Sequence, residues 1–122
     1  SRVSILGISS HPNVKDLREF PAKQFVSIMK KRGMIIRVYD PLFSYNELVE
    51  MGYPAEMTLK KAVEGVDCLV FATAHDQFKN LGLKKIKFFV RQPSAIVDMA
   101  CVIDPIKAER EGFIYRGLGR GM

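Results

Sequence analysis

A run of small polar residues, one histidine and one arginine follows the first apolar stretch of the sequence. Residues 3–8, VSILGI, are apolar and partly β-branched, and residues 9–19 come directly after them. Hydroxyl, imidazole and guanidinium groups in such a place are donors for phosphate oxygens. The glycine fingerprint G-x-G-x-x-G is missing, because Gly7 is followed by ISSH. We therefore expect no dinucleotide bound in the usual first-loop manner.

Two other residues, His75 and Cys101, have side chains capable of acid–base or nucleophilic chemistry. No orienting group or oxyanion loop accompanies them, and such an isolated pair is more often structural. We interpret His75 with Asp76 as the cap of a short helix, and Cys101 with Cys68 as reduced core thiols of a cytoplasmic protein. The sequence has no CxxC and no run of histidines. We expect no catalytic residue and no metal ligand in this chain.

Strand-like and helix-like segments alternate along the chain. Strands are expected at 3–8, 34–40, 67–73, 95–99 and 113–119, and helices at 21–33, 44–52, 58–66 and 104–112. This alternation predicts parallel strands with right-handed crossovers, and hence a three-layer α/β/α, Rossmann-like domain with a mainly parallel sheet. In the first helix, Phe25, Ile28 and Met29 recur at helical spacing and are predicted to be buried against the sheet.

Four loops are candidates for ligand binding because each follows a predicted strand. In open α/β sheets, ligands bind beyond the carboxyl ends of the strands, near the point where the strand order reverses. By this rule the candidate segments are residues 9–19, 40–43, 73–78 and 99–104.

Composition limits the class of protein and of partner. The 122 residues are 48% hydrophobic with a mean hydropathy of +0.01, which suits one domain with an ordinary core. A net charge of +6 favours anionic partners such as phosphates, nucleotides or nucleic acid. We expect no membrane span, because no apolar run approaches about 18 residues. Nucleic acid is an unlikely partner, because no RNP motif, zinc finger or helix-turn-helix is visible.

Five segments resemble one known family. LGISSHPNVKDLREFPA, residues 6–22, is similar to the signature LGxAFKPNTDDLRESPA that opens the C-terminal domain of the UDP-glucose/GDP-mannose dehydrogenase family. Four further segments resemble later parts of that domain in the same order, namely VYDP at 38–41, ATAHDQF at 72–78, IVDM at 96–99 and YRGLGRG at 115–121.

The resemblance implies a part of a three-domain enzyme that oxidises a sugar C6 hydroxyl with two NAD. In that family an N-terminal Rossmann domain holds NAD, a central region carries the catalytic cysteine, and the C-terminal domain covers the UDP half of the substrate. Residues 1–122 would then be a single C-terminal nucleotide-sugar-binding domain, with the NAD domain and the central domain absent from this chain. Its partners would be a UDP-sugar and the remainder of the dehydrogenase or its subunits, and the chain alone would be inactive.

The resemblance also implies roles for three residues. Ser10 and His11 stand where the family has the Phe-Lys pair that approaches the nucleotide sugar, so they are the expected substrate-binding residues. Arg18 matches the family's arginine near the NAD phosphates and is the expected cofactor-binding residue, since guanidinium groups suit phosphate oxygens. Local pairing of Arg18 with a neighbouring carboxylate is the alternative for that side chain.

A different function class stays open at this point. The chain could be a stand-alone basic α/β module whose partner is another protein or a nucleic acid. The loop after the predicted fourth strand favours this alternative, because Asp98-Met99-Ala100 stands where the family often has Asp-Gly-Arg.

Overall fold

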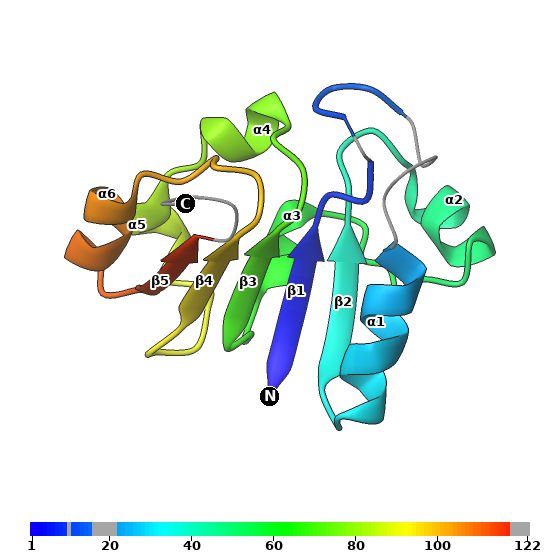
Figure 1. Ribbon diagram of the computed structural model, residues 1–122, viewed down its shortest axis with the longest axis horizontal. Coiled ribbons are helices and arrows are strands. Elements are labelled where there is room, and N and C mark those ends of the chain that lie inside the picture. The colour runs from blue at the N-terminus through cyan, green and yellow to red at the C-terminus, as the bar shows by residue number, and fades with distance from the viewer. Residues whose placement is uncertain (10, 16–21, 118–122) are drawn as a thin grey trace.

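The computed structural model of the chain describes residues 1–9, 11–15 and 22–117 (Figure 1). Strands and helices alternate along it, as the sequence predicts. The strands are β1 (Arg2–Leu6), β2 (Ile35–Tyr39), β3 (Cys68–Phe71), β4 (Ala95–Asp98) and β5 (Ile114–Gly117). The helices are α1 (Ala22–Lys31), α2 (Tyr45–Glu50), α3 (Leu59–Val63), α4 (Asp76–Lys79), α5 (Leu83–Ile86) and α6 (Pro105–Arg110).

The strands form one parallel sheet in the order β2-β1-β3-β4-β5. β1 lies between β2 and β3, with Ile5 opposite Val38 on one side and Val70 on the other. The chain leaves β1 toward β2 and then returns to the other side of β1 to form β3. The strand order therefore reverses between β1 and β3, which is where ligands bind in open α/β sheets. The predicted α/β, Rossmann-like fold class is confirmed.

Two apolar clusters cover the two faces of the sheet. On one face, Val3 and Ile5 of β1 pack with Val26 of α1 and Leu48 of α2. On the other face, residues of β1, β3 and β4 pack against α3, α5 and α6. Figure 1 shows α1 in front of the sheet and α3 and α5 behind it. This burial on both faces explains why β1 and β3 are nearly continuous apolar runs.

The predicted buried face of α1 is partly wrong. Val26 is the buried residue, and Phe25 and Met29 pack half-buried against the same cluster. Ile28 is 53% exposed, because it lies two positions after Val26, about 200° around the helix axis. Helical spacing alone identified two of the three contacts but not the direction of the buried stripe.

Local end signals were better predictors of the later helices. Ser44 caps α2, and its hydroxyl and the Glu47 carboxylate each accept a backbone N–H in a complete capping box. α5 was not predicted; it is a single turn whose N-cap, Gly82, makes no side-chain cap bond. Among the described helices none is long and apolar enough to cross a membrane.

The two cysteines occupy different environments. Cys68 is half-buried in β3, and burial, together with the charge of Asp67, raises the pKa of its thiol to about 11. Cys101 is exposed, in the turn after β4 with φ 56°. The prediction that Cys101 is a core thiol is wrong, because that turn faces solvent rather than continuing the strand.

Candidate functional site

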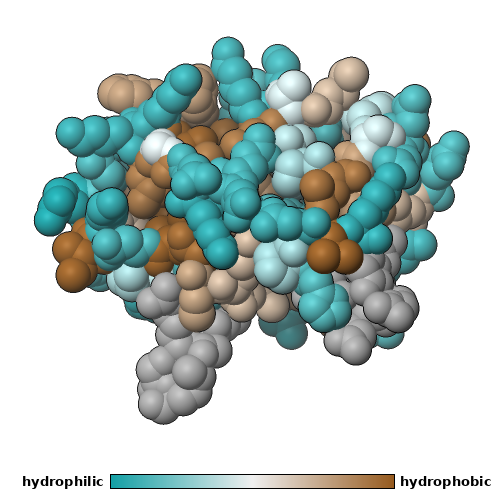
Figure 2. Space-filling view, turned by 90° about the horizontal axis from the view of Figure 1, so that it is seen from above, coloured by the Kyte–Doolittle hydropathy of each residue, from teal (hydrophilic) through white to brown (hydrophobic). Residues whose placement is uncertain are grey.

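The loops that follow β1, β2 and β3, here named the first, second and third loop, meet at the carboxyl edge of the sheet. Figure 2 shows this face of the molecule from above. Hydrophilic side chains cover most of that face, with hydrophobic groups exposed between them. The backbones of the first and third loops touch there. Gly7 has φ +99°, and a Cβ at that position would lie 2.7 Å from the Thr73 Cβ. Gly7 therefore serves close packing of two loops, since only glycine fits both the conformation and the space.

Hydrogen bonds to the second and third loops also fix the first loop. Thr73 Oγ1 donates to the Ser9 carbonyl at 2.6 Å. Asp40, at the end of β2, is fully buried. Its Oδ2 accepts from the Ile8 N–H at 2.8 Å and from Ser9 Oγ at 3.5 Å, and its Oδ1 accepts from the Leu42 N–H at 2.8 Å. A buried carboxylate is stable only when it is bonded in this way.

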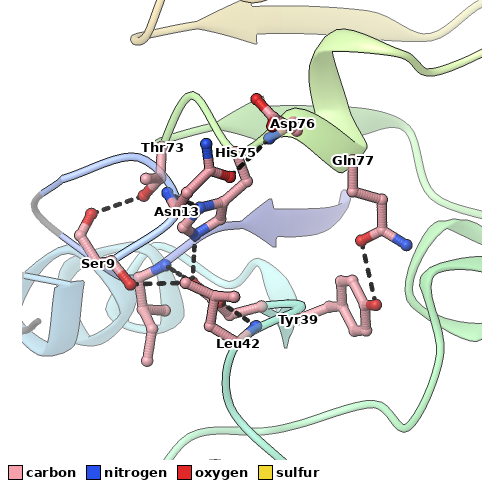
Figure 3. Close-up of polar contacts among 10 residues, drawn as sticks. Ser9, Asn13, Tyr39, Leu42, Thr73, His75, Asp76 and Gln77 are labelled. Carbon is pink, nitrogen blue, oxygen red and sulfur yellow. Dashed lines mark hydrogen bonds and ion pairs between the residues drawn. The ribbon is translucent and has the colours of Figure 1, made fainter. Parts of the chain in front are cut away.

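His75 joins the second loop to the first. Its side chain is 1% exposed, and its Nε2 lies 3.1 Å from Asp40 Oδ2. Its Nδ1 accepts from the Asn13 N–H at 2.8 Å. Because Nδ1 is an acceptor, the ring proton is assigned to Nε2, which donates to Asp40. Figure 3 shows the His75 ring between Asn13 on one side and the turn that carries Leu42 on the other.

Asn13 returns a second bond to the same segment. Its Oδ1 accepts from the Asp76 N–H at 3.0 Å, so Asn13 and the start of α4 bind each other reciprocally. Asn13 has φ 58°, a left-handed conformation that asparagine tolerates. The prediction that His75 and Asp76 cap α4 is wrong in its donors and acceptors. His75 occupies the N-cap position without a side-chain cap bond, and the cap oxygen comes from Asn13, 63 positions away.

Lys15 ties the far end of the described loop to α2. Its ammonium group pairs with Glu47 and lies 5.1 Å from the centroid of the Phe43 ring. The hydrogen bond from Lys15, followed by the one from the Ser44 N–H, holds the pKa of Glu47 below its ordinary value. Residues 11–15 are thus attached to β3–α4 at one point and to α2 at another.

Of the three predicted site residues, one lies within the described part of the structure. His11 is exposed in the first loop, two positions before Asn13. Ser10 and Arg18 lie outside the described residues, so their roles stay predictions. Asn13, Asp40 and Thr73 were not predicted as site residues. A usable signal was present, because each follows a different strand of a sheet predicted to be parallel, and such ends share one edge.

The fourth loop is built separately around Asp98. This carboxylate, fully buried at the end of β4, accepts from the backbone N–H groups of Ala100, Val102 and Ile103 at 3.2, 3.1 and 2.9 Å. The Tyr115 hydroxyl donates to it at 3.0 Å. The loop therefore wraps around one carboxylate of its own strand.

The buried polar groups of the three-loop site hold the first loop in place. Both ring nitrogens of His75 are engaged inside the protein, so the imidazole has no nitrogen directed at a reacting atom. In the part of the chain that the structure describes, no group of three His, Cys, Asp or Glu is placed to hold a metal ion. The exposed residues of the site are residues 11–15 of the first loop, together with Asp76 and Gln77 of the third.

Comparison with known proteins gives consistent matches. Residues 4–105 match the profile of the UDP-glucose/GDP-mannose dehydrogenase family, UDP binding domain. The chain is 34% identical to the UDP-glucose 6-dehydrogenase of Pseudomonas aeruginosa, over 97% of this chain and 27% of that protein. It is 33% identical to the UDP-N-acetyl-D-mannosamine dehydrogenase of Pyrococcus horikoshii, over 98% of this chain and 25% of that protein.

A solved structure supports the same grouping. The crystal structure of NDP-N-acetyl-D-galactosaminuronic acid dehydrogenase from Methanosarcina mazei superposes with a TM-score of 0.86 at 26% identity, covering 98% of this chain and 25% of that one. The chain thus spans about a quarter of the length of the proteins it resembles.

Proposed function

The chain belongs to the UDP-glucose/GDP-mannose dehydrogenase family, where it matches the UDP-binding domain, and from that premise we propose that its first loop receives the diphosphate of a UDP-sugar. Ser10 and His11 are the proposed substrate-binding residues. The observation that supports this most is the place of the loop: residues 9 and 11–15 lie at the point where the strand order reverses and are bonded there to two other loops.

The wider proposal concerns the enzyme that such a domain serves. The relatives are named as UDP-sugar dehydrogenases, and this chain spans about a quarter of their length. We propose that it acts as the C-terminal domain of an NAD-dependent UDP-sugar 6-dehydrogenase, with the NAD-binding domain and the catalytic cysteine supplied by the remainder of that enzyme. Arg18 would reach the NAD phosphates where the domains meet. No observation in the described structure favours the alternative of a basic module for protein or nucleic acid.

This proposal predicts binding without turnover. Purified chain mixed with NAD and UDP-glucose is expected to produce no NADH, because the first loop lacks the dinucleotide glycines and the catalytic cysteine is supplied by the remainder of the enzyme. NADH formation above a no-protein blank, followed by absorbance, would contradict the proposal that NAD binding and catalysis depend on the remainder of the enzyme.

UDP binding itself is measured by calorimetric or NMR titration. With only one wall of the cleft present, we expect a Kd of about 1 mM, or about 4 kcal/mol. Uridine is expected to bind at least about tenfold more weakly, because it lacks the diphosphate.

A charge variant tests the loop assignment. His11→Lys is expected to tighten UDP binding by about threefold to tenfold, since a fixed cation forms charge-assisted bonds with phosphate. The matched control is Ile106→Lys on α6, where the side chain is 66% exposed and lies on another element. Equal tightening in both variants would show a nonspecific effect of net charge and would count against the first loop as the site.

A further inference from the structure

We infer that His75 is a positioning residue for the nucleotide loop: it fixes the backbone at Asn13 so that His11 is presented to the diphosphate. The inference rests on the proposed function of that loop. Its structural basis is the pair of hydrogen-bond partners of the imidazole ring, Asp40 and Asn13.

Two hydrogen bonds and one aromatic contact hold the ring of His75. One nitrogen is bonded to the buried Asp40 carboxylate and the other to the Asn13 N–H. Phe78 packs against the ring, with centroids 5.7 Å apart and an interplanar angle of 50°. A ring fixed by two hydrogen bonds and a packing contact keeps one orientation, so its acceptor nitrogen is a fixed point for the loop backbone.

Asn13 is the residue of the loop that most needs such a fixed point. Its left-handed backbone reverses the direction of the chain two residues after His11. Its side chain is exposed, so packing does not hold it, and its described bonds run to His75 and Asp76. Loss of the bond to His75 would leave the loop free to sample other conformations before a ligand binds. A ligand must then supply the ordering free energy, which lowers its affinity.

The two hydrogen bonds of His75 can be separated by two substitutions. In His75→Asn the amide oxygen stands near the position of Nδ1, so it can accept from Asn13, while the bond to Asp40 is lost. In His75→Gln the longer amide reaches Asp40, while the acceptor for Asn13 is lost. Each variant loses one bond of the ring, and the bond to the buried Asp40 carboxylate is the charge-assisted one, so a purely structural role predicts that His75→Asn weakens UDP binding at least as much as His75→Gln.

The experiment measures UDP affinity and exchange of the Asn13 amide hydrogen in wild type and in both variants. Positioning predicts that His75→Gln raises the Kd for UDP by about fivefold to tenfold and accelerates Asn13 exchange. It predicts that His75→Asn raises the Kd by less than about twofold and keeps the amide protected. Equal losses of affinity in the two variants, or unchanged affinity in His75→Gln, would overturn the inference.

Two further arms keep the outcome interpretable. If either His75 variant fails to fold, exchange of the Asn13 amide hydrogen is measured in the wild type without ligand: positioning by His75 predicts that this amide is protected relative to an unfolded peptide, whereas exchange at the unfolded rate overturns the inference. If the amide signals of the first loop in the wild type do not change on addition of UDP, the proposed function is contradicted instead. This result can be told apart from failure of the inference, because exchange of the Asn13 amide is measured without ligand.

Discussion

Two buried carboxylates, Asp40 at the end of β2 and Asp98 at the end of β4, organise the carboxyl edge of the sheet in different ways. Asp98 is bonded mainly within its own loop, to three N–H groups no more than five positions ahead. Asp40 bonds one N–H two positions ahead, and its other partners lie 31 to 35 positions away, on the β1 loop and at His75.

The same residue type thus gives two structural outcomes at one edge of the sheet. A carboxylate that binds its own loop makes that loop rigid and independent of its neighbours. A carboxylate that binds other loops couples their conformations, so a change in the conformation of one loop alters that of the next. The Asp40 region is therefore the part of the edge suited to bind a ligand with several loops, and the Asp98 region is a self-contained support.

Removal of each carboxylate is expected to give the largest effects. Asp40→Ala and Asp98→Ala each leave buried N–H donors without an acceptor, so each is expected to lower the free energy of unfolding by about 3 to 5 kcal/mol in urea denaturation. Their local effects should differ. Hydrogen exchange should accelerate in residues 8–15 and 73–77 for Asp40→Ala, and only in residues 99–103 and at Tyr115 for Asp98→Ala. Acceleration over the same residues in both variants would refute the distinction.

Two glycine substitutions, one beside the Asp40 region and one at the opposite edge of the sheet, are expected to have smaller effects. Gly7→Ala meets the Thr73 Cβ at 2.7 Å in addition to its unfavourable φ, and it should cost about 3 kcal/mol. Gly112, after α6, has a similar φ of +91° with nothing within 4 Å of the added Cβ, so Gly112→Ala should cost only about 1 kcal/mol. Thermal or urea unfolding measures both. Equal costs would mean that the two loops at Gly7 can separate without loss.

The smallest expected effect is that of acidification on the contact between Lys15 and Glu47. The pKa of Glu47 is lowered from 4.5, mainly by the hydrogen bond from Lys15, so the folded carboxyl binds a proton less readily than the unfolded one. This contribution to stability is fully present above pH 4.5 and is lost as the pH falls through the lowered pKa. NMR titration of the Glu47 carboxyl should give a midpoint below 4.5, and Lys15→Met should bring it back toward that value. An unchanged midpoint in Lys15→Met would show that Lys15 is not the cause.

Much of the fold follows from local signals in the sequence. Gly33 follows the end of α1, and Ser44 with Glu47 marks the start of α2, because these effects act over a single helical turn. The parallel sheet follows from the alternation of the elements. The missed α5 has no comparable local signal, since it is one turn that forms by packing Leu83 and Ile86 into the core.

The site was harder to predict because its bonds are long-range. Asn13 and His75 are 62 positions apart, and Asp40 and His75 are 35 apart, so no spacing along the chain connects them. Local reasoning assigned His75 to its nearest helix, whereas the sheet directs it toward two other loops. The resemblance assigned residues 6–22 to the family signature, but the residues that hold the described part of this loop come from the ends of β2 and β3.

The most direct test of the account is a map of UDP binding on isotope-labelled chain. Amide shifts are followed during titration to several millimolar UDP, with the two regions compared in one experiment. We expect saturable shifts in the amides of residues 8, 9, 11 and 13–15, smaller ones in residues 73–77 that are bonded to them, and none in residues 99–103 around Asp98. Shifts that appear first or only around Asp98, or none anywhere at saturating UDP, would contradict it.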